Sequence, residues 1–278
     1  DFTAKKPDRS YIESNAANIP NYIGQIASAW LKRGNDPFDL QVLIPMYKGV
    51  AGINHVNKVL QELFNPLEER LEFAFQETVF RQGDKVLHLV NEAALDVFNG
   101  DIGEITDLVP AKYTESKQDE IVMSFDGNEV IYPRGEWYKI TLAYAMSIHK
   151  AQGSEFPSVI VPMVSSYSRM LERNLLYTAI TRAKKSLILL GESRSFQTAV
   201  ARQGANRKTY LIERFGVEVD VAEAHGAQDN ESVESLEIEE DVISENMTTP
   251  ETYILTEENI TTIDPMIGLT AEDVAVFK

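Results

Sequence analysis

The strongest constraint on the fold is a change in hydrophobic period near the middle of the chain. Between about residues 80 and 138, short apolar runs alternate with polar residues at a period of two, and turn signals separate the runs. Outside this stretch, apolar residues recur at helical spacing or form the continuous runs typical of buried parallel strands. This order predicts an α/β domain interrupted by a β-rich insertion.

The two flanks supply the helices and strands of the predicted α/β domain. Before the insertion, the pattern predicts a helix at 16–33, a strand at 39–44, and a helix from Gly52 to the Asn65-Pro66 pair. After the insertion, the predicted elements are a helix at 145–152, a strand at 158–164, a helix at 173–182, and a strand at 186–190. The continuous apolar strands favour a parallel sheet buried on both faces.

The insertion is expected to be a small β-barrel. Period-two strands are predicted at 86–90, 102–108, 121–125 and 129–132. The Asp126-Gly127 pair between the last two is a strong hairpin signal. Several short strands in so short a stretch are typical of a barrel. The expected parts are therefore the first part of the α/β domain (1–79), the barrel (80–138), the second part of the domain (139–215) and an acidic tail (216–278).

Charge is distributed unevenly along the chain. Residues 216–278 contain 17 of the 43 acidic residues and a single lysine, so they carry about −16 of the net charge of −17. The remaining body is close to neutral and can hold a basic groove for nucleic acid, although the sequence pI is about 4.7. We expect a largely disordered tail, which acts as a solubilising segment or presents the apolar peptide 263–269 to a partner protein or to the body of this same protein.

Several classes of protein are excluded or disfavoured. The chain has no cysteine, and its four histidines are scattered, so no metal site is expected. There is no apolar run long enough for a membrane span, and the first residues do not resemble a signal peptide. A cytoplasmic location without membrane contact is the expectation.

Three segments carry most of the chemical information: 41–49 (QVLIPMYKG), 143–156 (AYAMSIHKAQGSEF) and 174–184 (NLLYTAITRAK). In the second segment, a predicted helix breaks at Gly153 among polar side chains that cannot all face a core. Such a corner, followed by a buried strand, is where α/β sheets place ligand contacts, although a polar surface turn has the same composition. Taken alone, Arg182 in the third segment is more often a solvated charge.

Together the three segments resemble motifs IV, V and VI of superfamily-1 DNA helicases, most closely the RecD-like branch that includes the exodeoxyribonuclease V alpha subunit. The resemblance covers about residues 41–190. In that family an SH3-like barrel lies just before motif V, and 97–105 (VFNGDIGEI) resembles its first hairpin. The resemblance implies a RecA-like motor domain interrupted by an SH3-like barrel.

The family places ATP and Mg²⁺ between two RecA-like domains, which implies roles for individual residues. Arg182 matches the arginine finger that stabilises charge on the γ-phosphate. The positions matched to nucleotide contacts are Gln152, Gly153 and Glu155, and, more weakly, Lys48 and Gly49. The positions matched to single-stranded DNA contacts are Thr141, Ser147, His149 and Lys150.

The phosphate-binding Gly-x-x-x-x-Gly-Lys-Ser/Thr pattern is absent from the sequence. With the resemblance, this absence predicts the carboxy-terminal motor half of a helicase, inactive alone and completed by a first motor domain that binds most of the ATP, and the resemblance implies movement from 5′ to 3′. The alternative is a non-catalytic docking module on a helicase-like scaffold. The match at Arg182 separates the two interpretations, because a docking module does not need an arginine finger.

Overall fold

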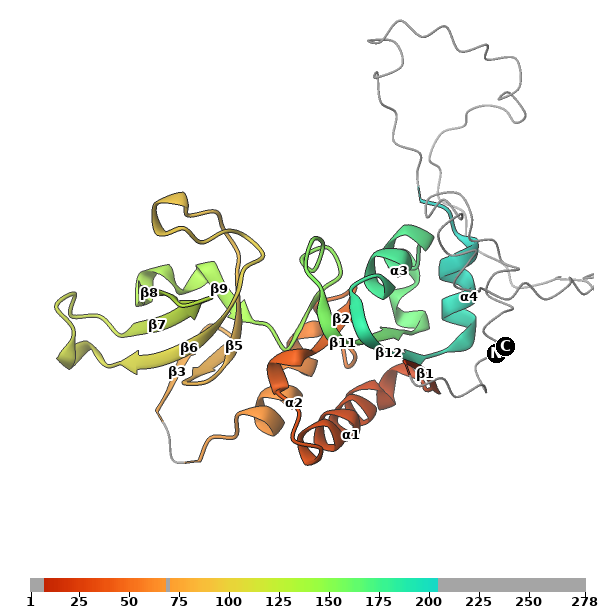
Figure 1. Ribbon diagram of the computed structural model, residues 1–278, viewed down its shortest axis with the longest axis horizontal. Coiled ribbons are helices and arrows are strands. Elements are labelled where there is room, and N and C mark those ends of the chain that lie inside the picture. Colours follow the sequence, from red (N-terminus) through yellow and green to blue (C-terminus); the bar gives the residue numbers. More distant parts are fainter. Residues whose placement is uncertain (1–7, 69–70, 205–278) are drawn as a thin grey trace, which may run out of the picture. The chain divides into compact units, whose positions relative to one another are not determined.

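A parallel β-sheet forms the first part of the structure, a computed structural model that describes residues 8–68 and 71–204 (Figure 1). Its strands, in spatial order, are β1 (Arg9–Glu13), β12 (Ala183–Gly191), β11 (Phe156–Met163), β2 (Leu40–Ile44) and β10 (Ala145–Ser147). All neighbouring pairs are parallel. The predicted tail at 216–278 and its apolar peptide lie outside the described residues.

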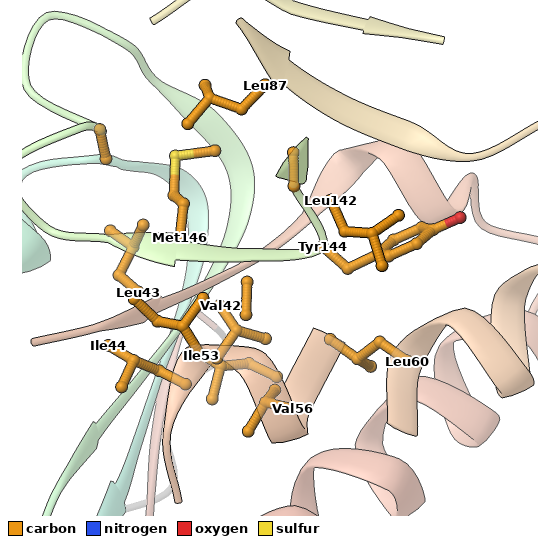
Figure 2. Close-up of a cluster of buried hydrophobic side chains, with 14 of the residues drawn as sticks. Val42, Leu43, Ile44, Ile53, Val56, Leu60, Leu87, Leu142, Tyr144 and Met146 are labelled. Atoms are coloured by element: carbon orange, nitrogen blue, oxygen red, sulfur yellow. The ribbon is translucent and has the colours of Figure 1, made fainter. Parts of the chain in front are cut away.

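Four helices accompany this sheet: α1 (Ile19–Lys32), α2 (Ile53–Phe64), α3 (Arg173–Ile180) and α4 (Ser193–Ala201). Helix α1 packs against α2, and α3 packs against α4. Figure 2 shows buried side chains of this core, among them Val56 and Leu60 of α2 and Val42 of β2, and α2 also contacts β10. As predicted, α2 ends before the Asn65-Pro66 pair, since proline disfavours helical backbone in the residue before it.

Antiparallel strands make up the insertion. A two-stranded sheet pairs β3 (Glu72–Phe75) with β4 (Thr78–Arg81). A five-stranded sheet has the order β8 (Asn128–Pro133), β7 (Glu120–Phe125), β6 (Ile102–Val109), β5 (Lys85–His88) and β9 (Ile140–Leu142). The predicted hairpin is confirmed: Asp126 and Gly127 join β7 to β8 with φ values of 48° and 90°, the left-handed conformation that a tight two-residue turn requires.

Short 3₁₀ turns connect many of these elements. They are η1 (Ala16–Asn18), η2 (Pro37–Asp39), η3 (Ala93–Leu95), η4 (Ala111–Tyr113), η5 (Arg134–Lys139) and η6 (Ser165–Met170). The turn η5 buries Trp137, which packs against three phenylalanines from β3 and β4. This aromatic cluster joins the small sheet to the five-stranded one.

The helix predicted at 145–152 is wrong. Its first residues form the edge strand β10, and a series of turns follows. Asn57 of α2 explains the difference, because its side chain donates to the carbonyl oxygen of Ala145 (2.9 Å) and accepts from the Ala145 amide (2.7 Å). These bonds and the pairing with β2 satisfy the backbone in an extended form, which overrides the local apolar spacing.

A buried carboxylate lies where the chain enters the five-stranded sheet. Asp84 is fully buried and accepts hydrogen bonds from Gln61 Nε2 (2.6 Å), Asn65 Nδ2 (2.9 Å), the Arg81 amide (2.7 Å) and the Tyr144 hydroxyl (3.0 Å). Burial raises the pKa of Asp84, and these hydrogen bonds oppose the shift. The carboxylate thereby ties α2 to the chain segments at both ends of the insertion.

Candidate functional site

Arg182 and the segment around Gly153 meet at the amino ends of β11 and β12. The Arg182 Nη1 donates to the Ser154 carbonyl oxygen (3.0 Å), and the Phe156 amide donates to the Arg182 carbonyl oxygen (2.8 Å). The pairing register of the two strands is consistent with this contact, since Phe156 of β11 pairs with Ala183 of β12. The structure therefore brings the second and third sequence segments together around one partly exposed guanidinium.

The end of helix α3 determines where Arg182 lies. The Thr181 hydroxyl lies within donating distance of the carbonyl oxygens of Tyr177 (3.0 Å) and Thr178 (3.1 Å), and the Tyr177 carbonyl also accepts from the Thr181 amide (3.1 Å). Arg182 then donates through Nε to the Thr178 carbonyl (3.1 Å) and through Nη2 to the Thr181 hydroxyl (3.2 Å). Three oxygen acceptors thus hold the guanidinium in one orientation.

Gly153 forms an open bend beside this guanidinium. Its φ of +94° is one that side-chain-bearing residues rarely adopt, and a Cβ added there would have no atom within 4 Å. Gln152 and Glu155 on either side are exposed, and Glu155 forms an ion pair with Lys184 (3.1 Å). The bend leaves room for a ligand to approach the backbone next to Arg182.

Ser147, His149 and Lys150 lie at the other end of the same connection. The chain runs from Ser147, at the carboxyl end of β10, back to Phe156, at the amino end of β11. The buried Ser147 hydroxyl accepts from the Lys150 amide (3.2 Å), and His149 is exposed. Lys150 Nζ donates to Asn99 Oδ1 (2.6 Å), so a loop of the insertion contacts this group.

Thr141 lies apart from the other three predicted DNA contacts. It is on β9 opposite Leu87 and lines a cavity of about 260 Å³ between α2, β4 and β9. Most of the residues that line that cavity are polar types, among them Asn57 and Arg81, but they include none of Ser147, His149 and Lys150.

Lys48 and Gly49 are separated from Arg182 by the length of the sheet. Leu40, the first residue of β2, pairs with Ser158 near the start of β11, and Ile44 at the end of β2 pairs with Ser147. Because the strands are parallel, the loop after β2 emerges at the end opposite Arg182. Among the predicted nucleotide contacts, Gln152, Gly153 and Glu155 gather with Arg182, whereas Lys48 and Gly49 do not.

Sequence reasoning missed the residues that support the site. Ser154, Thr178 and Thr181 hold the Arg182 guanidinium, and Asn99 contacts Lys150. The Asn99-Gly100-Asp101 run signals a turn, but no local pattern indicates that this turn reaches Lys150. Within 8–68 and 71–204, no group of three or more His, Asp or Glu side chains could hold a metal ion, and no helix is long and apolar enough to cross a membrane.

Two family models match the chain. Residues 142–190 match the UvrD-like helicase C-terminal domain, and residues 56–125 match the ATP-dependent RecD-like DNA helicase SH3 domain. The first match contains the group around Arg182, and the second contains most of the antiparallel strands. The fold is thus an α/β domain with a parallel sheet and an SH3-like insertion.

Curated relatives agree with these matches. The ATP-dependent RecD2 DNA helicase of Deinococcus radiodurans is 39% identical over 179 residues, which cover 64% of this chain and 24% of that protein. The RecBCD enzyme subunit RecD of Mycolicibacterium smegmatis is 31% identical over 168 residues, covering 60% and 28%. The chain thus spans about a quarter of the length of these relatives.

Solved structures of Pif1 helicases are also similar. The Bacteroides Pif1 helicase in complex with ADP-AlF3 and single-stranded DNA is 16% identical, with a TM-score of 0.39 over 74% of this chain and 54% of that one. The family models and the curated relatives together show that this chain is similar to a carboxy-terminal portion of RecD-like DNA helicases.

Proposed function

We propose that the chain is the second motor half of an ATP-dependent DNA helicase, in which Arg182 is the arginine finger. ATP with Mg²⁺ is held mainly by the first motor domain, and the Gly153 bend and Arg182 close on it from this side. The observation that carries the proposal is the meeting of Arg182 with the Ser154 carbonyl beside an open glycine bend.

The electrostatics of Arg182 suit this role. ATP hydrolysis places negative charge on the γ-phosphate oxygens, and a guanidinium stabilises that charge best when no carboxylate already neutralises it. All three acceptors of Arg182 are uncharged oxygens, and no carboxylate in the described part of the chain forms an ion pair with it. Its neighbour Glu155 is paired with Lys184 instead. The Arg182 guanidinium thus has a defined position, and no carboxylate among the described residues neutralises its charge.

Single-stranded DNA is proposed to contact the opposite end of the 148–155 connection. There His149 is exposed, and Lys150 contacts Asn99 of the insertion. A strand lying across this group would contact the motor domain and the SH3-like insertion together. The connection itself would link the DNA to the nucleotide bend, as an enzyme that moves 5′ to 3′ along DNA by hydrolysing ATP requires.

The test is Arg182→Lys in the full-length protein, with Arg194→Lys, an exposed arginine of α4, as the control. Lysine keeps the charge but cannot reproduce the planar fork, so we expect ATP turnover to fall by roughly 10³-fold or more. The KM for ATP should change far less, because the contact strengthens in the transition state. Near-normal turnover in Arg182→Lys would show that Arg182 is an ordinary surface charge and would refute the proposal.

A further inference from the structure

Lys85 belongs to the SH3-like insertion, yet its ammonium group lies against the parallel sheet. It is the first residue of β5, and only 1% of it is exposed. Its Nζ donates to the carbonyl oxygen of Phe38 (2.8 Å), in the turn that precedes β2, and to Gln41 Oε1 (3.0 Å) within β2. One side chain therefore joins the insertion to the amino end of the motor-domain sheet.

Two aromatic rings complete the surroundings of the ammonium. Nζ lies 5.7 Å from the centroid of the Phe38 ring and 5.5 Å from that of Phe156, distances at which a cation is attracted to a ring face. Phe156 begins β11, and its amide donates to the Arg182 carbonyl oxygen (2.8 Å). Only Phe156 thus separates the ammonium from the backbone of the proposed finger.

Gln41 extends the link to the segment by which the chain leaves the insertion. Its Nε2 donates to the carbonyl oxygens of Ala143 (3.0 Å) and Tyr144 (3.2 Å), while the Ala143 amide donates to the Lys85 carbonyl oxygen (2.9 Å). The side chains of Lys85 and Gln41 therefore hold both passages of the chain between the two sheets. We refer to these two residues as the junction pair.

Burying an ammonium group to make such a junction carries a large desolvation penalty. No carboxylate in the described residues forms an ion pair with Lys85; Asp36 and Asp39 beside it only partly offset the cost of burial, which lowers the pKa of Lys85 to about 7. The side chains in contact with Nζ, Phe38, Gln41 and Phe156, are uncharged. A methionine of similar length would fill the same space without that cost. Packing alone does not account for a lysine here.

We propose that Lys85 is a positioning residue that fixes the start of β11, and through it the backbone of Arg182, to the SH3-like insertion. Contacts made by the insertion would then shift the finger relative to ATP. The proposal rests on the proposed role of Arg182. It adds a specific physical route between the insertion and the nucleotide, through residues outside the three sequence segments.

The experiment compares Lys85→Met with Lys112→Met, which removes an exposed lysine of the same insertion, both in the full-length protein. We expect Lys85→Met to lower the kcat of DNA-stimulated ATP hydrolysis by about ten- to a hundredfold with little change in KM, as for a misplaced catalytic group. Lys112→Met should behave as wild type.

A second measurement does not depend on catalysis. Hydrogen exchange of the Phe156 amide should be faster in Lys85→Met than in wild type at the same pH. If the variant does not fold, protection of this amide in wild type should rise between pH 7 and 8.5 after correction for the intrinsic rate, because an opening that exposes Lys85 raises its lowered pKa and so becomes less favourable as pH rises. Normal turnover in Lys85→Met, or unchanged Phe156 protection, would overturn the proposal. If instead Arg182→Lys retains full turnover, the proposed function fails, while the exchange result still decides whether Lys85 fixes β11.

Discussion

The Arg182 Nη1 and the Ser154 carbonyl oxygen lie 3.0 Å apart, so the end of α3 and the loop before β11 hold the same guanidinium. Any change in the backbone of that loop therefore acts on the position of the proposed finger. Gly153, whose φ is +94°, is the position in this loop where the backbone conformation is least compatible with a side chain.

Gly153→Ala should reduce ATP turnover severalfold without lowering the melting temperature much. A Cβ at this position meets no atom within 4 Å, so the cost is only the left-handed backbone, about 1 kcal/mol. The loop can avoid that cost by changing conformation, which moves Ser154. Gly135→Ala, at a position without positive φ, is the control. Steady-state turnover and thermal unfolding of both variants check the prediction, and equal turnover in the two would contradict it.

The 278-residue chain alone should not hydrolyse ATP. The sequence has no phosphate-binding glycine loop with its lysine, and Arg182 can only stabilise charge on a phosphate that another domain holds. Phosphate release should therefore stay at background with and without single-stranded DNA. A DNA-stimulated activity from the purified chain would contradict the prediction.

Lys150→Ala should weaken single-stranded DNA binding mainly at low salt. If the lysine contacts one phosphate, its removal should lower the slope of log affinity against log salt by about 0.7. Lys112→Ala provides the matched control, as an exposed lysine of the insertion. Fluorescence anisotropy across a salt series measures both slopes. Identical slopes for Lys150→Ala and wild type would exclude Lys150 from the DNA contact.

Stability should rise with pH through the range set by Lys85. Burial lowers the pKa of Lys85 to about 7, whereas the pKa of a lysine in the unfolded chain is about 10.4. Between these values the unfolded state binds more protons, so the free energy of unfolding increases as pH rises from about 7 toward 10. Lys85→Met should lack this increase. Urea unfolding at several pH values checks this, and parallel profiles for the two proteins would argue against a buried ammonium.

Much of the fold follows from local patterns, because those patterns act over few residues. The Asp126-Gly127 turn needs left-handed backbone at two positions, and Pro66 disfavours helical backbone at Asn65 through a clash between neighbouring residues. The mistaken helix at 145–152 has the opposite cause. There the deciding hydrogen bonds come from Asn57, which lies 88 residues away in the sequence and carries no local signal.

The candidate site was predictable to a similar extent. Gly153 and Arg182 were matched to nucleotide contacts only through the family resemblance, and the structure brings Arg182 next to Ser154, the neighbour of Gly153, while their roles stay predictions. The separation of Lys48 from Arg182 depends on strand order, since β2 lies between β11 and β10. Lys85 could not be identified in advance, because a single lysine at the start of a strand normally points to solvent. Its burial depends on Phe38 and Phe156, from distant parts of the chain.

The order of strands in the parallel sheet also determines how the chain can fold. Strand β2 pairs with β10 and β11, which are separated from it by roughly a hundred residues, and the insertion occupies most of that interval. Closing so long a loop while it is unstructured is entropically costly and slow. If the insertion folds first, the end of β9 places Ala143 and Tyr144 next to Lys85, where they can bond to Gln41 of β2. The loop that must then close to pair β2 with β10 and β11 is short. The insertion then acts as the folding template of the domain that surrounds it.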